Sequence, residues 1–108
     1  MITGASSGIG RTLSFWYLNN GARVALVGRD LGELEKIGRL FPAQALVVKC
    51  DLTIDINMFH MKQSIQEKFG RCDILINCAG KSSILVDLTT MRGAKIISAM
   101  HRARRDLV

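Results

Sequence analysis

The apolar residues of this chain follow two kinds of pattern. Short runs of aliphatic and β-branched residues occur at 24–27, 45–48 and 74–76, and between them apolar residues return every three or four positions. Short continuous runs are typical of strands buried on both faces, and the three-to-four spacing is typical of amphipathic helices. Strands that alternate with helices predict an α/β fold with a parallel sheet.

The helical spacing predicts three helices that cover this sheet. Their apolar positions are Ile9, Leu13, Trp16 and Tyr17 in the first, Leu31, Leu34 and Ile37 in the second, and Ile54, Met58, Met61, Ile65 and Phe69 in the third. Asn20-Gly21 and Gly70 are expected to end the first and third helices, and Gly38 to break the second. Because these apolar faces must cover the sheet, we expect Trp16 and Tyr17 to lie in the core.

The first predicted strand is short. Only Met1-Ile2-Thr3 precedes a glycine-rich stretch, whereas strands usually run about five or six residues. In a sheet of order 3-2-1-4 this strand is central, so its shortness leaves both neighbouring strands partly unpaired. We therefore expect that either the chain or its natural product starts late.

The stretch Thr3-Gly4-Ala5-Ser6-Ser7-Gly8-Ile9-Gly10 carries the pattern G-x-x-x-G-x-G. Glycine allows a sharp turn, close approach of the backbone to an anion, and tight packing of the following helix. A helix that opens near Ile9 or Gly10 directs its unpaired N–H groups and the positive end of its dipole at the same point. The stretch therefore predicts a site for a dinucleotide diphosphate, with an ordinary Gly/Ser-rich turn as the alternative.

Three further signals follow the predicted strands in order. Gly28-Arg29-Asp30 follows the second strand, Cys50-Asp51-Leu52 the third, and Asn77-Cys78-Ala79-Gly80 the fourth. With the glycine stretch, they make residues 1–80 resemble the short-chain dehydrogenase/reductase family. The resemblance implies a truncated Rossmann-like, doubly wound parallel sheet and hydride transfer between a nicotinamide and a carbonyl or alcohol. Cys78 replaces the second Asn of the family's Asn-Asn-Ala-Gly motif, which weakens one structural hydrogen bond without abolishing the cleft.

The resemblance also implies which residues contact the cofactor. The phosphates and ribose would be held by Gly4, Ser6, Ser7, Gly8, Ile9 and Gly10, the 2′-phosphate by Arg29, the adenine by Asp51 and Leu52, and the nicotinamide side by Asn77, Ala79 and Gly80. Two alternatives stay open. Asp51 can instead form a strand-end turn or a helix cap, and Asn77 can serve only to tie strands together.

The end of the second strand bears on the choice of cofactor. In dinucleotide-binding folds an acidic residue about 20 positions after the glycines binds the ribose 2′-OH, whereas a nearby Arg suits a 2′-phosphate. Gly28 stands where that carboxylate would be, and Arg29 follows it. A guanidinium holds phosphate bidentately, so NADP(H) is favoured over NAD(H). Alternatively Arg29 is a plain solvent-exposed cation. Asp30 is expected to cap the next helix, with Glu33 three residues later.

The catalytic residues that the resemblance implies cannot be located. The family uses a Tyr with a Lys four residues later, and a Ser upstream, but Tyr17 is the one tyrosine and has Gly21 four positions on. No flanking motif assigns Ser82, Ser83 or Ser98. The chain is expected to end before a fifth strand, so whether it is an enzyme stays open. The alternative is a non-catalytic truncated or alternatively spliced product that acts as a nucleotide-binding or protein-interaction module.

Residues 81–108 are expected to form a divergent segment beyond a cofactor-binding half-domain of residues 1–80. Thr89-Thr90 can cap a basic C-terminal helix whose apolar stripe is Ile96, Met100, Ala103 and Leu107. Such a stripe usually docks on its own domain, although a membrane surface or a partner groove is also chemically suitable. Without a fifth strand, the fourth exposes an apolar edge through which homo-oligomers can form.

Charge and cysteines limit the remaining classes. The net charge of +6 arises from +2 in residues 1–80 and +4 in residues 81–108, and no aromatic residue interleaves with the later charges. This pattern argues against a nucleic-acid partner. Cys50, Cys72 and Cys78 form no C-x-x-C pair, so we expect neither a disulfide framework nor a metal site. Free cysteines also indicate a reducing compartment. With no apolar run long enough to span a membrane and no leader pattern, a cytoplasmic location is expected, while the substrate stays undetermined.

Overall fold

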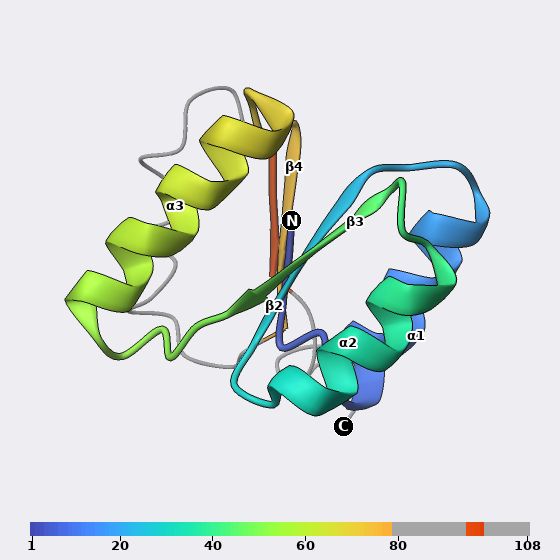
Figure 1. The fold of residues 1–108 in the computed structure, drawn as a ribbon, viewed down its shortest axis with the longest axis horizontal. Coiled ribbons are helices and arrows are strands. Elements are labelled where there is room, and N and C mark those ends of the chain that lie inside the picture. Colours follow the sequence, from blue (N-terminus) through green and yellow to red (C-terminus); the bar gives the residue numbers. More distant parts are fainter. Residues whose placement is uncertain (79–94, 99–108) are drawn as a thin grey trace.

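The computed structural model describes residues 1–78 and 95–98 (Figure 1). Its elements in chain order are β1 (Ile2–Thr3), α1 (Gly8–Asn19), β2 (Val24–Gly28), α2 (Leu31–Leu40), β3 (Ala45–Lys49), α3 (Asp55–Phe69), β4 (Ile74–Asn77) and β5 (Lys95–Ser98). The strands form one parallel sheet of order β3-β2-β1-β4-β5. The predicted α/β class and the predicted order 3-2-1-4 are confirmed.

Helices cover both faces of the sheet, with α1 and α2 on one side and α3 on the other (Figure 1). Alternate residues of β2 therefore enter different cores. Ala25 and Val27 belong to a cluster with Met58, Met61 and Ile65, here called the α3-side core. Val24 and Leu26 belong to a cluster with Leu18, Leu34 and Ile37, here called the α1/α2-side core. Two covered faces explain why β2 is a continuous apolar run, buried at every position.

The prediction that Trp16 lies in the core is wrong, because this residue of α1 is 58% exposed. The buried positions of α1 are Gly10, Ser14 and Leu18. Trp16 lies two residues from Ser14 and from Leu18, about 200° around the helix, and so faces away from the sheet. The inner face was missed because two of its three residues are small or polar and carry no hydrophobic signal.

The predicted break of the second helix at Gly38 is also wrong, since α2 runs on to Leu40. A Cβ on Gly38 would lie 2.7 Å from Cγ2 of Val47 on β3. Gly38 therefore lets α2 lie close to the sheet instead of ending the helix. The other two expected ends are correct, because Gly21 and Gly70 have φ of 87° and 76° after α1 and α3.

The carboxyl-terminal segment departs most from expectation. Residues Lys95–Ser98 form β5, in register with β4 from Ile74↔Lys95 to Asn77↔Ser98, where the sequence predicts a basic helix and no fifth strand. The β-branched pair Ile96-Ile97 suits a parallel strand, and this outweighs the sparse helical stripe. The edge of β4 is therefore paired with β5 and is not exposed, so the expected route to homo-oligomers through an open β4 edge is not supported. Three groups of predicted residues lie outside the described part of the chain: Met100, Ala103 and Leu107 of the stripe, the capping pair Thr89-Thr90, and Ser82 and Ser83.

Candidate cofactor-binding site

The glycine stretch forms the turn from the carboxyl end of β1 into α1, at the centre of the sheet. Gly4 and Gly8 have φ of 66° and 55°, in the left-handed region that favours glycine. A Cβ on Gly10 would lie 2.0 Å from the carbonyl oxygen of Gly4, so only glycine lets α1 approach the turn this closely. The N–H of Ala5 donates to the carbonyl of Val27 at 3.1 Å and fixes the turn to β2.

The start of α1 is suited to an anion. The first helical hydrogen bond there runs from the N–H of Arg11 to the carbonyl of Ser7 at 3.2 Å, so the N–H groups of Gly8, Ile9 and Gly10 precede it. Ser7 stands at the cap position in extended conformation, is exposed, and makes no side-chain cap hydrogen bond. The first turn holds no acidic residue that would repel a phosphate. Its geometry matches helix N-termini that bind phosphate.

Arg29 lies on a short connection that is held on both sides. The carbonyl of Gly28 accepts a hydrogen bond from the N–H of Cys50 at 2.8 Å, and Asp30 Oδ1 accepts one from the N–H of Glu33 at 3.1 Å. The expected cap at Asp30 is thus confirmed, and Arg29 is exposed. A Cβ on Gly28 would lie 3.3 Å from Ser6 Oγ, so the end of β2 adjoins the glycine turn.

One charged contact at this edge was missed by sequence reasoning. Arg11 donates from Nη1 to Glu33 Oε2 at 3.0 Å and links α1 to α2, and Lys36 donates to Glu33 Oε1 at 2.8 Å. Lys36, and to a smaller degree Arg11, hold the pKa of Glu33 below its usual range. Local periodicity carries no signal for this contact, because Arg11 and Glu33 lie 22 residues apart and on different helices.

Asp51 forms the strand-end turn that the sequence left open as an alternative. Its Oδ1 accepts hydrogen bonds from the N–H of Thr53 at 3.0 Å and from Thr53 Oγ1 at 2.6 Å. The N–H of Asp51 donates to Asn57 Oδ1 at 3.3 Å, which ties the turn to α3. Leu52 packs against the α3-side core. Contact of Asp51 and Leu52 with an adenine stays a prediction.

Asn77 ties the central strands together. It is 2% exposed, and its Oδ1 accepts a hydrogen bond from Thr3 Oγ1 at 2.7 Å. The Thr3 hydroxyl also accepts a hydrogen bond from the N–H of Cys78 at 3.1 Å. Thr3 of β1 is therefore bonded to both Asn77 and Cys78 at the end of β4. Burial raises the pKa of the Cys78 thiol. Contact of Asn77 with a ligand stays a prediction, and Ala79 and Gly80 lie outside the described residues.

Other candidate groups lie away from this edge or form no site. Tyr17 is nine residues beyond Gly8 on α1, about 14 Å along the helix axis, and it lines a cavity at the opposite end of the sheet. Across residues 1–78 and 95–98, no cluster of His, Cys, Asp and Glu is placed to hold a metal ion. In the same part of the chain, no helix has the length and apolar character needed to cross a bilayer.

A parallel sheet with helices on both faces, a glycine turn after the central strand, and a helix N-terminus at the carboxyl edge define the class of dinucleotide-binding α/β domains. The sequence profile of the short chain dehydrogenase family matches residues 1–103. The chain therefore belongs to the short-chain dehydrogenase family, as the motifs predict.

Individual relatives agree with this assignment. The chain is 38% identical over 82 residues to an uncharacterized oxidoreductase of Staphylococcus epidermidis, covering 76% of this chain and 36% of that protein. It is 34% identical over 96 residues to dehydrogenase/reductase SDR family member 7 of Mus musculus, covering 82% and 28%. The chain thus spans about a third of the length of these relatives.

Solved structures of the family share the fold. L-sorbose reductase from Gluconobacter frateurii, in complex with NADPH and L-sorbose, superposes with a TM-score of 0.66 at 32% identity, covering 74% of this chain and 32% of that one. The 3-ketoacyl-(acyl-carrier-protein) reductase from Brucella melitensis, in complex with NADH, also gives 0.66 at 32% identity, covering 69% and 31%. Both forms of the nicotinamide cofactor thus occur among these neighbours.

Proposed function

We propose that this chain provides the cofactor-binding part of an NADP(H)-dependent oxidoreductase that transfers a hydride between the nicotinamide and a carbonyl or alcohol. The observation that supports it most is the fit of α1 against the glycine turn, where a Cβ on Gly10 would lie 2.0 Å from the Gly4 oxygen. That contact brings the free N–H groups of α1 to the carboxyl edge of β1, where a diphosphate can accept from them.

Each remaining candidate residue has a role in this proposal. Residues Gly4 to Gly10 hold the diphosphate, Asp51 and Leu52 the adenine, and Asn77, Ala79 and Gly80 the nicotinamide side. The bound cofactor supplies or receives the hydride, and the chain positions it. Residues 1–80 form the cofactor-binding unit in this proposal, and the buried, unpaired cysteines support a cytoplasmic, reducing location.

The preference for a 2′-phosphate rests on Gly28 and Arg29. No carboxylate stands at Gly28 to repel a phosphate, and the Arg29 backbone is fixed by the Gly28 and Asp30 hydrogen bonds. The planar guanidinium of Arg29 can donate two parallel hydrogen bonds to a phosphate, and its rigid fork loses little entropy for each bond formed. Because solved structures of the same fold contain either NADPH or NADH, the fold alone does not determine the cofactor, and local residues such as Gly28 and Arg29 must do so.

Calorimetric titration of the full chain with NADPH and with NADH tests the proposal. NADPH should bind at least about tenfold more tightly, since hydrogen bonds to charged groups contribute about 1.5–3 kcal/mol. Arg29→Ala should remove most of that difference and leave NADH affinity unchanged. Arg39→Ala is the matched control, because Arg39 is an exposed cation at the far end of α2, paired with Glu35 at 3.4 Å. Equal affinities of the unmodified chain for both cofactors would refute the preference, and binding of neither would refute the proposed function.

A further inference from the structure

A second cation, Lys49, lies beside the connection that carries Arg29. Lys49 ends β3 and is paired in register with Gly28, the last residue of β2. The N–H of Cys50 donates to the carbonyl of Gly28 at 2.8 Å, which fixes the two strand ends to each other. Adjacent strands lie about 4.8 Å apart, and the flexible stem of a lysine is longer than this, so the ammonium group of Lys49 can reach the end of β2.

The side chain of Lys49 leaves the sheet on the face covered by α1 and α2. Ala45 and Val47 of β3 pack against the α1/α2-side core, and alternate residues of a strand share a face. Lys49 follows Val47 by two positions and is exposed. On the same face, a Cβ on Gly28 would lie 3.3 Å from Ser6 Oγ, so the glycine turn borders this space. Because Gly28 has no side chain, none from that position separates Lys49 from the turn.

The carboxylates near these strand ends are engaged in other contacts. Asp30 Oδ1 accepts a hydrogen bond from the N–H of Glu33 at 3.1 Å and caps α2. Asp51 Oδ1 accepts hydrogen bonds from the backbone and the hydroxyl of the turn that follows it. The carboxylate of Glu33 pairs with Arg11 at 3.0 Å and with Lys36 at 2.8 Å. The negative charges at this edge therefore already have partners.

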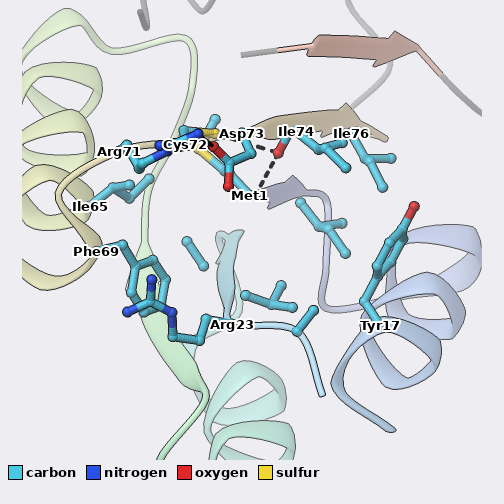
Figure 2. Close-up of a pocket in the computed structure, with 14 residues that line it drawn as sticks. Met1, Tyr17, Arg23, Ile65, Phe69, Arg71, Cys72, Asp73, Ile74 and Ile76 are labelled. Atoms are coloured by element: carbon cyan, nitrogen blue, oxygen red, sulfur yellow. Dashed lines mark hydrogen bonds and ion pairs between the residues drawn. The ribbon is translucent and has the colours of Figure 1, made fainter. Parts of the chain in front are cut away.

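Arg29 and Lys49 are left as two positive charges beside each other. Neither forms an ion pair within the part of the chain that the structure describes. By contrast, Arg71 at the opposite end of the sheet is paired with Asp73 (Figure 2). Two like charges at close range repel each other, and an anion between them converts this repulsion into attraction. The paired ends of β2 and β3 are therefore suited to a ligand with more than one negative charge.

We propose that Lys49 binds the 2′-phosphate of NADP(H) together with Arg29, as a second residue that determines cofactor specificity. This inference rests on the proposed function, which brings the phosphate to the connection after β2. A phosphate monoester carries about 1.5–2 negative charges near pH 7, enough to neutralise both cations. The guanidinium of Arg29 donates two parallel hydrogen bonds, and the ammonium of Lys49 contributes a compact charge from the β3 side. The uncharged 2′-hydroxyl of NADH gains no such contact.

Calorimetric titration of the full chain and its Lys49 variants with NADPH and with NADH tests this inference. Lys49→Ala should weaken NADPH binding at least about fivefold, because hydrogen bonds between charged groups are the strong ones, and should leave NADH affinity unchanged. Lys49→Arg should retain most of the NADPH affinity, because it keeps the positive charge. The matched control is Lys68→Ala, which removes an exposed lysine from the last turn of α3, at the opposite end of the sheet.

The double variant Arg29→Ala with Lys49→Ala completes the test. It should bind NADPH no more tightly than NADH, because both cations assigned to the phosphate are gone. Since Lys49 is exposed, the urea unfolding midpoints of its variants should coincide with that of the unmodified chain, which separates lost contact from lost fold.

Three results would overturn the inference: unchanged NADPH affinity in Lys49→Ala, equal losses for NADPH and NADH, or a preference for NADPH that persists in the double variant. The first two would leave the proposed function and the role of Arg29 intact. Binding of neither cofactor by the unmodified chain would instead refute the proposed function, and this inference with it.

Discussion

Gly8 and Gly10 of the glycine turn are needed for different physical reasons. Apart from its chain neighbours and its own helix backbone, a Cβ on Gly8 would meet no atom within 4 Å, so glycine is required there by the φ of 55°. Gly10 is required by contact, because its Cβ would overlap the carbonyl oxygen of Gly4. A side chain at Gly8 therefore strains the backbone locally, whereas one at Gly10 separates α1 from the turn.

Gly10→Ala should accordingly weaken NADPH binding by at least about tenfold and destabilise the fold by about 1–3 kcal/mol, the usual cost of overpacking. Gly8→Ala should cost about 1–2 kcal/mol through the left-handed conformation alone. Calorimetric titration and urea unfolding measure the two effects. Gly32→Ala is the control, since a Cβ there would meet only Asp30 Oδ1 at an ordinary 3.5 Å. If Gly10→Ala behaved like Gly32→Ala, close packing of α1 would not support the site.

At the scale of elements, the starts of α1 and α2 serve different purposes. Asp30 caps α2 through a side-chain hydrogen bond, whereas Ser7 at the start of α1 makes none. The capped helix fixes the connection that carries Arg29, whereas in the proposed function the N–H groups of the uncapped helix donate to the diphosphate.

Asp30→Ala should lower the free energy of unfolding by about 0.5–2 kcal/mol, the cost of losing a helix cap, and should reduce the preference for NADPH by freeing the Arg29 connection. Asp30→Asn should retain most of both properties, because Asn also caps helices. Ser7→Ala is the matched comparison and should leave stability within about 0.5 kcal/mol. Urea unfolding of the three variants measures how much unfolding free energy each one loses. A loss in Ser7→Ala as large as in Asp30→Ala would contradict the prediction.

Sequence periodicity predicted those elements whose burial depends on large apolar residues. The strands β2, β3 and β4 and the face Met58, Met61 and Ile65 of α3 are of this kind. It failed where small residues make the contact, as at Gly38 against Val47 and along Gly10 and Ser14 of α1. It also failed at β5, because pairing with β4 is a long-range property that four residues cannot signal alone.

For the molecule as a whole, the order of the strands could be predicted because motif spacing and the rules of parallel sheets constrain it. The glycine turn and the Asp30 cap could be predicted because their chemistry is local. The link between Arg11 and Glu33 and the hydroxyl of Thr3 between Asn77 and Cys78 could not, since each joins segments brought together only by folding.

The buried thiol of Cys50 should make the stability of the whole domain fall in alkali. Burial first, and the charge of Asp51 second, raise its pKa from 9.0 to about 11. An acid with a raised pKa in the folded state retains its proton there longer than in the unfolded chain, so its contribution is complete below pH 9 and is lost as pH rises toward 11. The loss should be on the order of 2 kcal/mol. Cys50→Ala removes this ionisation but not that of other groups, so urea unfolding of both chains from about pH 8 to about pH 11 isolates it. The difference in unfolding free energy between them should shrink across that interval, and a constant difference would mean that the Cys50 thiol ionises equally in both states.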